Sequence, residues 1–262
     1  MPERRVLFIG DVVGEPGRRA VESTLPLLIE RHSPDLVVTN GENVAGGLGI
    51  TERTARKLRE AGTDVITTGN HVFRHSEVYE YLDRSDRIVR PANYFESTPG
   101  RGSTVLEKDG VRWVILNLSG RVFVDAAYSP FHVADRILAK LSDDADYVIV
   151  DFHAEATSEK VALGWYLDGR VLAVIGTHTH VPTADGRVLP GGTAYISDVG
   201  MTGARGGVIG VKREQIIQRF LTQMPVRFET AEEDPWVMGC LVTSDRPGLA
   251  SSIEQILVPA EG

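Results

Sequence analysis

The sequence predicts an α/β fold in which two packed β-sheets are flanked by helices. In the first half, short apolar runs alternate with helical patterns, which is typical of βαβ units. The second half contains a hairpin pattern and further apolar runs, which two sheets with outer helices accommodate better than one doubly wound sheet. Because nothing in the composition divides the 262 residues, we expect residues 1–262 to form a single domain.

Three apolar runs of the first half predict parallel strands. Their near-continuous apolarity and β-branched content fit strands that are covered on both faces. The strands are expected at residues 6–9, 36–39 and 65–68.

Two helices are expected between these strands. Pro16 can open a helix that runs toward His32, and Pro26 should kink or divide it. Thr51 is placed to cap a second helix, which Gly62 ends.

The second half predicts a β-hairpin followed by mixed elements. Residues 104–106 and 111–118 flank the turn Asp109-Gly110, which is a common hairpin turn. Ser129-Pro130 should start a helix through Leu141, and Thr157 or Ser158 should cap another that ends at Gly169. Further strands are expected at residues 147–152, 171–175, 194–197 and 237–243.

The charge of the chain limits its partners. A net charge of −8 argues against double-stranded nucleic acid, whose binding normally requires a basic patch. It leaves room for a small anionic ligand, because bound metals can reverse the local potential.

The single cysteine and the N-terminal segment bear on disulfide bonding and on cellular location. Cys240 has no partner for an internal disulfide and lies in an apolar run, so we interpret it as a buried, inert thiol. The apolar run at residues 6–9 is too short for a signal peptide or a membrane span, so we expect a cytoplasmic protein without a membrane partner.

Five short polar motifs follow apolar strand-like runs, at the positions where open α/β sheets build their sites. Together they supply two acids, two amides and four imidazoles, a ligand set suited to a pair of divalent metals. The motifs are Gly10-Asp11, Gly41-Glu42-Asn43, Gly69-Asn70-His71, Phe152-His153 and Thr177-His178-Thr179-His180.

The two acids have alternative interpretations when each is taken alone. Asp11 could cap the following helix, and Glu42 and Asn43 could form a polar turn. However, two carboxylates at the ends of neighbouring parallel strands would repel each other unless a cation lay between them. Their combination therefore favours a metal site.

The remaining positions differ in how much they indicate. Asn70 alone is a weak ligand, and a lone histidine such as His153 is often a hydrogen-bonded core residue. His178 and His180 are more specific, because residues two apart in an extended segment project to the same side and can serve neighbouring metals.

Together these positions resemble the calcineurin-like metallophosphoesterase superfamily, and most closely its YmdB-like branch of bacterial 2′,3′-cyclic nucleotide phosphodiesterases. The resemblance extends from the motif at residues 8–14 to Ser197-Asp198-Val199-Gly200-Met201-Thr202-Gly203. It implies a four-layer double β-sandwich, consistent with the two-sheet prediction.

The chain departs from the broader superfamily at two positions. Val13 stands where a histidine is usual, and Glu42 stands where the bridging ligand is usually an aspartate. Both departures are features of the YmdB-like branch, in which the asparagine after the glutamate, here Asn43, resembles a substitute ligand. Exchange of an imidazole for an amide favours iron or manganese over zinc.

The resemblance also implies the site and its chemistry. It predicts two divalent or mixed-valence metal ions, with Glu42 bridging them, and hydrolysis of small phosphate esters by a metal-activated hydroxide. His71 resembles the proton donor to the leaving group, although a further ligand or a residue that orients one is the alternative. The first metal would be held by Asp11, Glu42, Asn43 and His180, and the second by Glu42, Asn70, His153 and His178.

Other functions stay open at this stage. The same site could serve a dinuclear amidohydrolase, or a regulatory protein that keeps its metals and binds nucleotide with little turnover. The spacing of Gly10, Gly14 and Gly17 does not fit a dinucleotide-binding fingerprint. Arg205 in its glycine-rich loop could contact phosphate or simply form a turn, and a homo-oligomer is possible.

Overall fold

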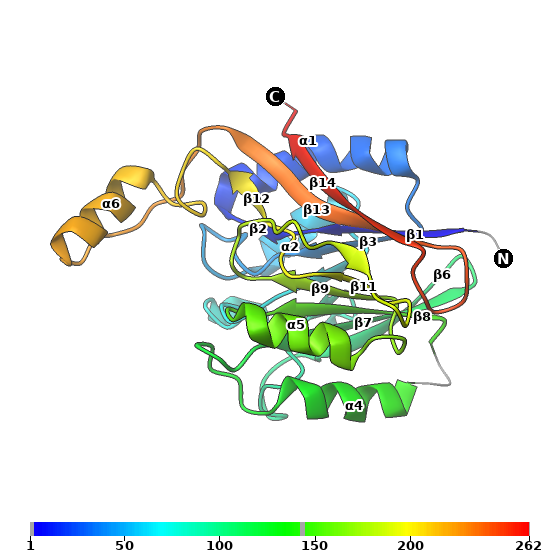
Figure 1. The fold of residues 1–262 in the computed structure, drawn as a ribbon. Helices are drawn as coiled ribbons and strands as arrows, with labels where there is room; N and C mark the ends of the chain where they lie inside the picture. Colours follow the sequence, from blue (N-terminus) through cyan, green and yellow to red (C-terminus); the bar gives the residue numbers. More distant parts are fainter. Residues whose placement is uncertain (1–2, 142–144, 262) are drawn as a thin grey trace.

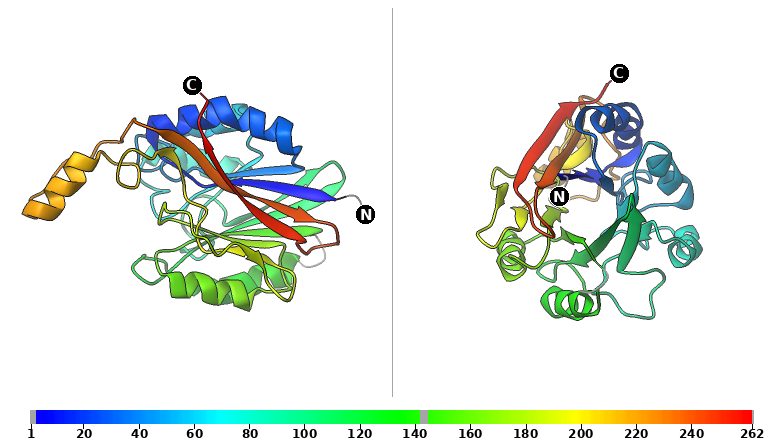
Figure 2. Two further views of the ribbon diagram at one scale, coloured as in Figure 1. Left: turned by 45° about the horizontal axis from the view of Figure 1, so that its top comes forward. Right: turned by 90° about the vertical axis from the view of Figure 1, so that its right-hand side faces the viewer.

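The computed structural model describes residues 3–141 and 145–261 and contains two β-sheets that pack face to face. Helices cover the outer face of each sheet, which gives four layers (Figure 1). The end-on view shows the same order of helix, sheet, sheet and helix (Figure 2). The predicted fold class is therefore confirmed.

The first sheet has the strand order β2-β12-β13-β1-β3-β4-β5, and β14 also pairs with β13. β1, β3, β4 and β5 run parallel, whereas β13 is antiparallel to β1. Its strands are β1 Arg4–Ile9, β2 Asp11–Val12, β3 Leu36–Asn40, β4 Val65–Thr67, β5 Ile88–Val89, β12 Met201–Ala204, β13 Pro235–Ser244 and β14 Ser252–Pro259.

The second sheet has the order β10-β11-β9-β8-β7-β6. β7, β8, β9 and β11 are parallel, while β6 and β7 form the predicted hairpin around Asp109 and Gly110, both at positive φ. Its strands are β6 Ser103–Lys108, β7 Val111–Ser119, β8 Tyr147–His153, β9 Ala173–Thr177, β10 Arg187–Val188 and β11 Ala194–Ile196.

The central strands are buried on both faces. In β1, Val6 and Phe8 pack into the core between the sheets, whereas Leu7 and Ile9 pack under the helices of the first sheet. A third cluster lies between the second sheet and its helices. The helices are α1 Gly14–His32, α2 Glu52–Glu60, the 3₁₀ turn Ser76–Val78, α3 Tyr79–Arg84, α4 Pro130–Leu141, α5 Thr157–Tyr166 and α6 Arg213–Thr222.

Several predictions about helix ends are confirmed and others are wrong. Thr51 caps α2 through a reciprocal bond with Thr54, as predicted. Pro26 was expected to kink or divide the first helix; α1 continues through it, so the helix is not divided, because the packing of one face on the sheet outweighs one lost hydrogen bond. For α5, the N-cap is Ala156 and the helix ends at Tyr166, before Gly169.

Two further features complete the description. Cys240 is a buried free thiol, as predicted, and burial raises its pKa. No helix in the described parts of the chain combines the length and the apolar character needed to cross a bilayer.

Candidate metal centre

All five predicted motifs meet at one edge of the two sheets. β1, β3 and β4 of the first sheet end there, and so do β8 and β9 of the second. Two groups of three side chains could each hold a metal ion, because within each group the ligand atoms all lie within 4.8 Å of one another. Glu42 belongs to both groups. These groups are Glu42, His153 and His178, and Asp11, Glu42 and His180.

One ring nitrogen forms the centre of the first group. His153 Nε2 lies 3.0 Å from Glu42 Oε2, 3.0 Å from Asn70 Oδ1 and 3.0 Å from His178 Nδ1. Ligand atoms about 2.1 Å from a cation and at right angles to each other lie about 3 Å apart. The spacing of these four atoms therefore fits a shared cation.

Three histidines each use one ring nitrogen for a supporting hydrogen bond and direct the other to the cluster. His180 Nδ1 donates to the carbonyl of Ile209 at 3.0 Å, and His178 Nε2 donates to Glu155 Oε2 at 3.0 Å. His153 Nδ1 lies 2.9 Å from Thr177 Oγ1. Such outer partners select the tautomer of a metal-binding histidine.

Thr177 connects His153 to a buried acid. Its hydroxyl donates to Asp151 Oδ1 at 2.7 Å, so its oxygen is left to accept from His153 Nδ1. Asn40 Nδ2 donates to Asp151 Oδ2 at 2.9 Å. Burial raises the pKa of Asp151 to about 6, while His153 and the hydrogen bonds oppose a larger rise. At neutral pH the acid is therefore ionised.

Charge balance in the cluster also favours a cation. Burial raises the pKa of Asp11, and Oδ1 of this carboxylate is buried without a hydrogen-bond partner among the described residues. Glu42 is fully buried, yet the charges and hydrogen bonds of His153 and His71 hold its pKa well below the usual range. Two buried carboxylates this close together are unfavourable unless positive charge compensates them.

The two central histidines have opposite pKa shifts. Burial lowers the pKa of His153, but the charge and hydrogen bond of Glu42 outweigh it and raise the value to about 9. Burial and the neighbouring His153 lower the pKa of His178 to about 3. His178 is therefore a neutral ligand, whereas on His153 a proton and a metal compete for Nε2.

Gly69 shows how closely the cluster is built. A Cβ at this position would lie 2.2 Å from Glu42 Oε2 and 2.3 Å from His153 Nε2. Glycine is thus the residue that allows Asn70 and His71 to follow β4 so close to the other strand ends.

The predicted geometry of His178 and His180 is wrong. They lie in a turn rather than an extended segment, with φ values of 97° and 66°. Non-glycine residues in this region are strained, which is a cost tolerated at functional sites. The turn directs His178 to the group with His153 and directs His180 to the group with Asp11.

A buried ion pair supports this turn. Asp198 Oδ2 accepts from Thr179 N at 3.0 Å and from Thr179 Oγ1 at 2.7 Å, and Lys160 Nζ lies 2.8 Å away. Lys160 and Asp198 are both almost fully buried. Neither residue was predicted to belong to the site, although Asp198 lies in one of the motifs that carry the resemblance.

Asn43 and His71 lie beside Glu42. The amide nitrogen of Asn43 donates to Glu42 Oε1 at 2.8 Å and faces His180 Nε2 at 3.3 Å. His71 Nδ1 lies 2.9 Å from Asn43 Oδ1 and 3.1 Å from Glu42 Oε1, so Nδ1 carries the proton. For Asn43 to share a cation with His180 through its oxygen, its amide must turn over.

Arg205 lies outside this cluster. Its guanidinium stacks over the ring of Trp236 at 4.5 Å. Both residues line an apolar cavity of about 380 Å³ beside His180. The contact with Trp236 accounts for the position of this arginine.

The comparisons with known proteins agree with this geometry. The sequence model of the family described as "YmdB-like protein" matches residues 7–256. The 2′,3′-cyclic-nucleotide 2′-phosphodiesterase of Bacillus subtilis (strain 168) is 48% identical over 255 residues, which cover 97% of this chain and 97% of that protein.

Two solved structures share the fold over nearly their whole length. A hypothetical protein from Thermus thermophilus superposes with a TM-score of 0.91 at 46% identity, covering 98% of this chain and 100% of that one. A novel phosphatase from Mycoplasma pneumoniae superposes with a TM-score of 0.92 at 35% identity, covering 100% and 95%. This chain therefore belongs to the YmdB-like family.

Proposed function

We propose that this protein is a metal-dependent phosphodiesterase that hydrolyses small phosphate esters, in particular 2′,3′-cyclic nucleotides. The similarity to the Bacillus subtilis enzyme along nearly the whole chain supports the reaction and the substrate class. The single observation that carries the proposal is the convergence of Glu42, Asn70 and His178 on His153 Nε2 at 3.0 Å each.

Two cations, bridged by Glu42, are proposed for the cluster. Glu42 is the member common to both groups of ligand atoms, and the unpartnered Asp11 Oδ1 supports a cation beside it. Asn43 pairs through a backbone β-bridge with Val13, the position at which the superfamily usually has a histidine, and its side-chain amide lies 3.3 Å from His180 Nε2. This placement supports the amide as a substitute for that imidazole. The first cation is assigned to Asp11, Glu42, Asn43 and His180, and the second to Glu42, Asn70, His153 and His178.

The composition of the ligand set favours iron or manganese. Three imidazoles suit transition metals better than magnesium, which prefers oxygen ligands and water. The carboxylates and amides make the set harder than the usual zinc site. Bound there, two divalent cations would lower the pKa of a shared water and offset the charge of the phosphate oxygens.

His71 is proposed to protonate the leaving alkoxide. Its Nδ1–H is directed to Glu42 and Asn43, and no described residue forms a hydrogen bond with its Nε2. The side chain is about one-third exposed, whereas His153 is fully buried. Because Nδ1 keeps its own proton, a second proton on Nε2 makes the ring an imidazolium, and this second proton could be transferred to a bound ester and replaced from solvent.

Elemental analysis followed by a phosphodiester panel tests this function. We expect two metal ions per chain and hydrolysis of 2′,3′-cyclic nucleotides, with Mn²⁺ or Fe²⁺ restoring activity to metal-free protein better than Mg²⁺. Restoration by Mg²⁺ alone would contradict the ligand set. Nucleotide binding without product release would indicate a regulatory protein, and hydrolysis of amides in place of phosphodiesters would indicate an amidohydrolase.

A further inference from the structure

The cavity beside His180, here called the hollow, adjoins the metal centre. Its volume is about 380 Å³, and His180, which is assigned to the first cation, forms part of its wall. This volume is at the lower end of the range for small-molecule sites, which is roughly 300–1,000 Å³. The rest of the wall is largely apolar and includes Val181, Met201, Trp236, Met238 and Leu257.

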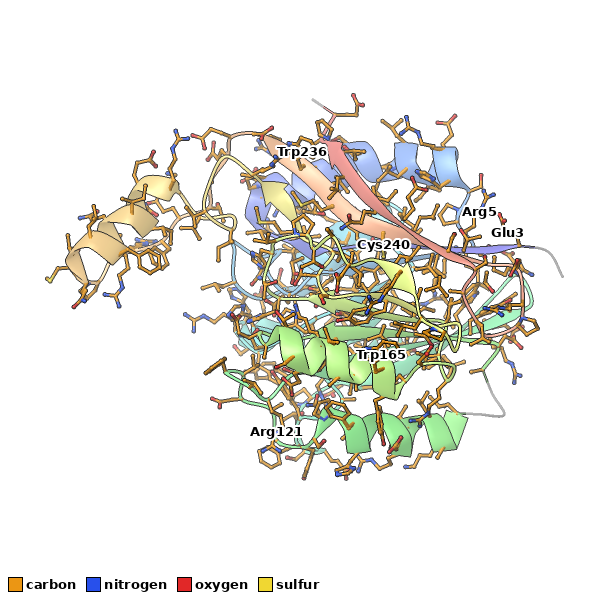
Figure 3. The ribbon with its side chains drawn as sticks, viewed as in Figure 1. Glu3, Arg5, Arg121, Trp165, Trp236 and Cys240 are labelled. Atoms are coloured by element: carbon orange, nitrogen blue, oxygen red, sulfur yellow. The ribbon has the colours of Figure 1, made fainter. Side chains whose placement is uncertain are left out.

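The pleat of β13 places the hollow at the end of the core between the sheets. Cys240 packs into that core, and side chains two residues apart lie on the same face of a strand, so Met238 and Trp236 continue this face outward. Figure 3 shows Cys240 and Trp236 along β13. The Met238 carbonyl accepts from the amide of Gly10 at 2.9 Å, next to the ligand Asp11. The hollow and the metal centre therefore share one edge of the first sheet.

Trp236 and Arg205 form a flat wall of the hollow. The guanidinium carbon of Arg205 lies 4.5 Å from the centroid of the Trp236 ring. Asp234 fixes both residues, because its carboxylate accepts from Trp236 Nε1 at 2.8 Å and its carbonyl accepts from the Arg205 amide at 2.9 Å. Arg205 is exposed, and no described residue forms a hydrogen bond or ion pair with its guanidinium. Its N–H groups are therefore available to a ligand.

The rim of the hollow next to the metal centre has a strained backbone. Ile209 lines the hollow at a φ of 45°, which is rare for a β-branched residue. Its carbonyl accepts from His180 Nδ1 at 3.0 Å, and His180 itself has a φ of 66°. Strain of this kind persists where the surrounding structure fixes it, typically at ligand sites. A wall residue of the hollow and a metal ligand are thus held together.

The chemistry of the neighbouring metal centre indicates what the hollow binds. In a 2′,3′-cyclic nucleotide one ribose separates the phosphate from the base, so the base must lie close to the metals. Bases stack on aromatic rings and on guanidinium planes, and they accept hydrogen bonds from arginine. An apolar hollow with a tryptophan and an arginine in its wall meets these requirements.

We propose that the hollow is the base-binding subsite, in which Trp236 and Arg205 hold the base of a nucleotide whose phosphate is bound at the metal centre. This inference rests on the proposed phosphodiesterase function and adds the residues that select a nucleotide over other phosphate esters. Neither residue would take part in the chemical step. Their contribution is to substrate binding, which changes KM and leaves kcat nearly constant.

Two substrates separate base binding from the reaction. One is 2′,3′-cyclic AMP, and the other is ethylene phosphate, a five-membered cyclic diester without ribose or base, whose hydrolysis phosphorus NMR can follow. For Trp236→Ala, KM for the cyclic nucleotide should rise roughly 10–100-fold, the contribution of one stacked base, with kcat little changed. The loss in kcat/KM on ethylene phosphate should be far smaller, because it has no base to stack.

The chain offers a matched control for this substitution. Trp165 on α5 is 51% exposed, and the guanidinium carbon of Arg187 lies 5.9 Å from its ring centroid (Figure 3). Trp165→Ala removes the same side chain from a similar contact outside the hollow, so it should change neither substrate. Trp236→Phe keeps an aromatic ring and should recover most of the affinity for the cyclic nucleotide.

A second variant fills the hollow without removing its wall. Leu257 is exposed and lies opposite Met238 in the pairing of β13 with β14, and tryptophan is favoured in strands. Leu257→Trp should therefore also raise KM for 2′,3′-cyclic AMP, while circular dichroism and metal content stay unchanged.

The outcomes separate this inference from the proposed function. Hydrolysis of neither substrate by the metal-loaded wild-type protein would overturn the phosphodiesterase function and the subsite with it. Hydrolysis of the cyclic nucleotide by the wild type, with an unchanged KM in Trp236→Ala and Leu257→Trp, would overturn the subsite alone. Equal losses on both substrates in Trp236→Ala would likewise exclude base binding, because they would show a general effect on the metal centre.

Discussion

The metal centre and α6 depart from the usual distribution of side chains in opposite directions. At the strand ends, charged and polar groups such as Asp11 and Glu42 are fully buried, whereas on α6 large apolar groups such as Phe220 are exposed. Both arrangements cost free energy in an isolated chain, because burial favours apolar groups and solvent favours polar ones. The buried acids at the strand ends therefore indicate a cationic partner.

The two regions also differ in how they are held. The metal centre draws side chains from residues 11 to 180 and ties them together by buried hydrogen bonds. α6, which lies in residues 209–228, is joined to the rest of the chain by the pair of Lys212 with Glu229 and by a few backbone hydrogen bonds. A substitution in the first region should therefore alter chemistry or folding, whereas one on α6 should leave the fold and the metal centre intact.

Removal of the shared carboxylate should have the largest effect. Glu42→Gln is expected to abolish turnover and to strip metal from both positions, because one carboxylate belongs to both groups of ligand atoms. Metal content per chain and activity are measured together, with circular dichroism to establish folding. The matched control is Glu80→Gln, the same change at an exposed position of α3, and two metals with near-normal turnover in the Glu42 variant would refute the bridging role.

Loss of His71 should be selective for the leaving group. His71→Ala should keep both metals and lower kcat on an alkyl phosphodiester by roughly 10²–10⁴-fold, the usual contribution of a general acid. An ester with a nitrophenolate leaving group needs little protonation and should lose much less. His75→Ala, at a histidine that bonds the Leu48 carbonyl, is the control. Equal losses on both esters, or loss of a metal, would make His71 a ligand or a positioning residue.

The buried pair of Lys160 with Asp198 should contribute more to stability than the exposed pair of Lys212 with Glu229 beside α6. Lys160→Met leaves Asp198 charged and buried, which should lower the free energy of unfolding by about 3–5 kcal/mol. Lys212→Met breaks the exposed pair with Glu229 and should lower the free energy of unfolding far less, because solvent screens that pair. Denaturant unfolding of both variants beside the wild-type protein measures the two losses. Similar losses of stability in the two variants would mean that the buried pair of Lys160 with Asp198 stabilises the fold no more than an exposed pair does.

Much of the fold and of the site could be predicted because parallel strands have a simple sequence signature. Residues 6–9, 36–39 and 65–68 are apolar on both faces, and polar residues follow each run at once. Since parallel strands end at the same edge, motifs far apart in the sequence could be placed together. The pairing of the strands themselves could not be predicted, because the pairing of β1 with β13 depends on contacts more than 200 residues apart.

The position of α6 and the residues that support the ligands could not be predicted, for different reasons. α6 has the spacing of an ordinary core-facing helix, and nothing local distinguishes a helix that covers a sheet from one that projects. Thr177 looks like a spacer before His178, and only the register of β8 and β9 sets it opposite His153. The left-handed turn at His178 and His180 depends on Asp198, which is 18 residues further along the chain than His180.

The smallest effect is expected at Thr177, where the connection between Asp151 and His153 can be cut without a change of shape. Thr177→Val removes the hydroxyl that accepts from His153 Nδ1 and donates to Asp151, so the imidazole is free to take the wrong tautomer. Affinity for the second metal should fall about 10–100-fold, the usual cost of losing such a support, while the first metal is retained.

Competition with a chelator at limiting Mn²⁺ measures metal binding at the two positions. The control Thr177→Ser keeps the hydroxyl and should restore binding of the second metal. If the valine and serine variants bound metal equally, the hydroxyl would be only a packing contact; if the valine variant lost both metals, the two positions would not be separable as proposed.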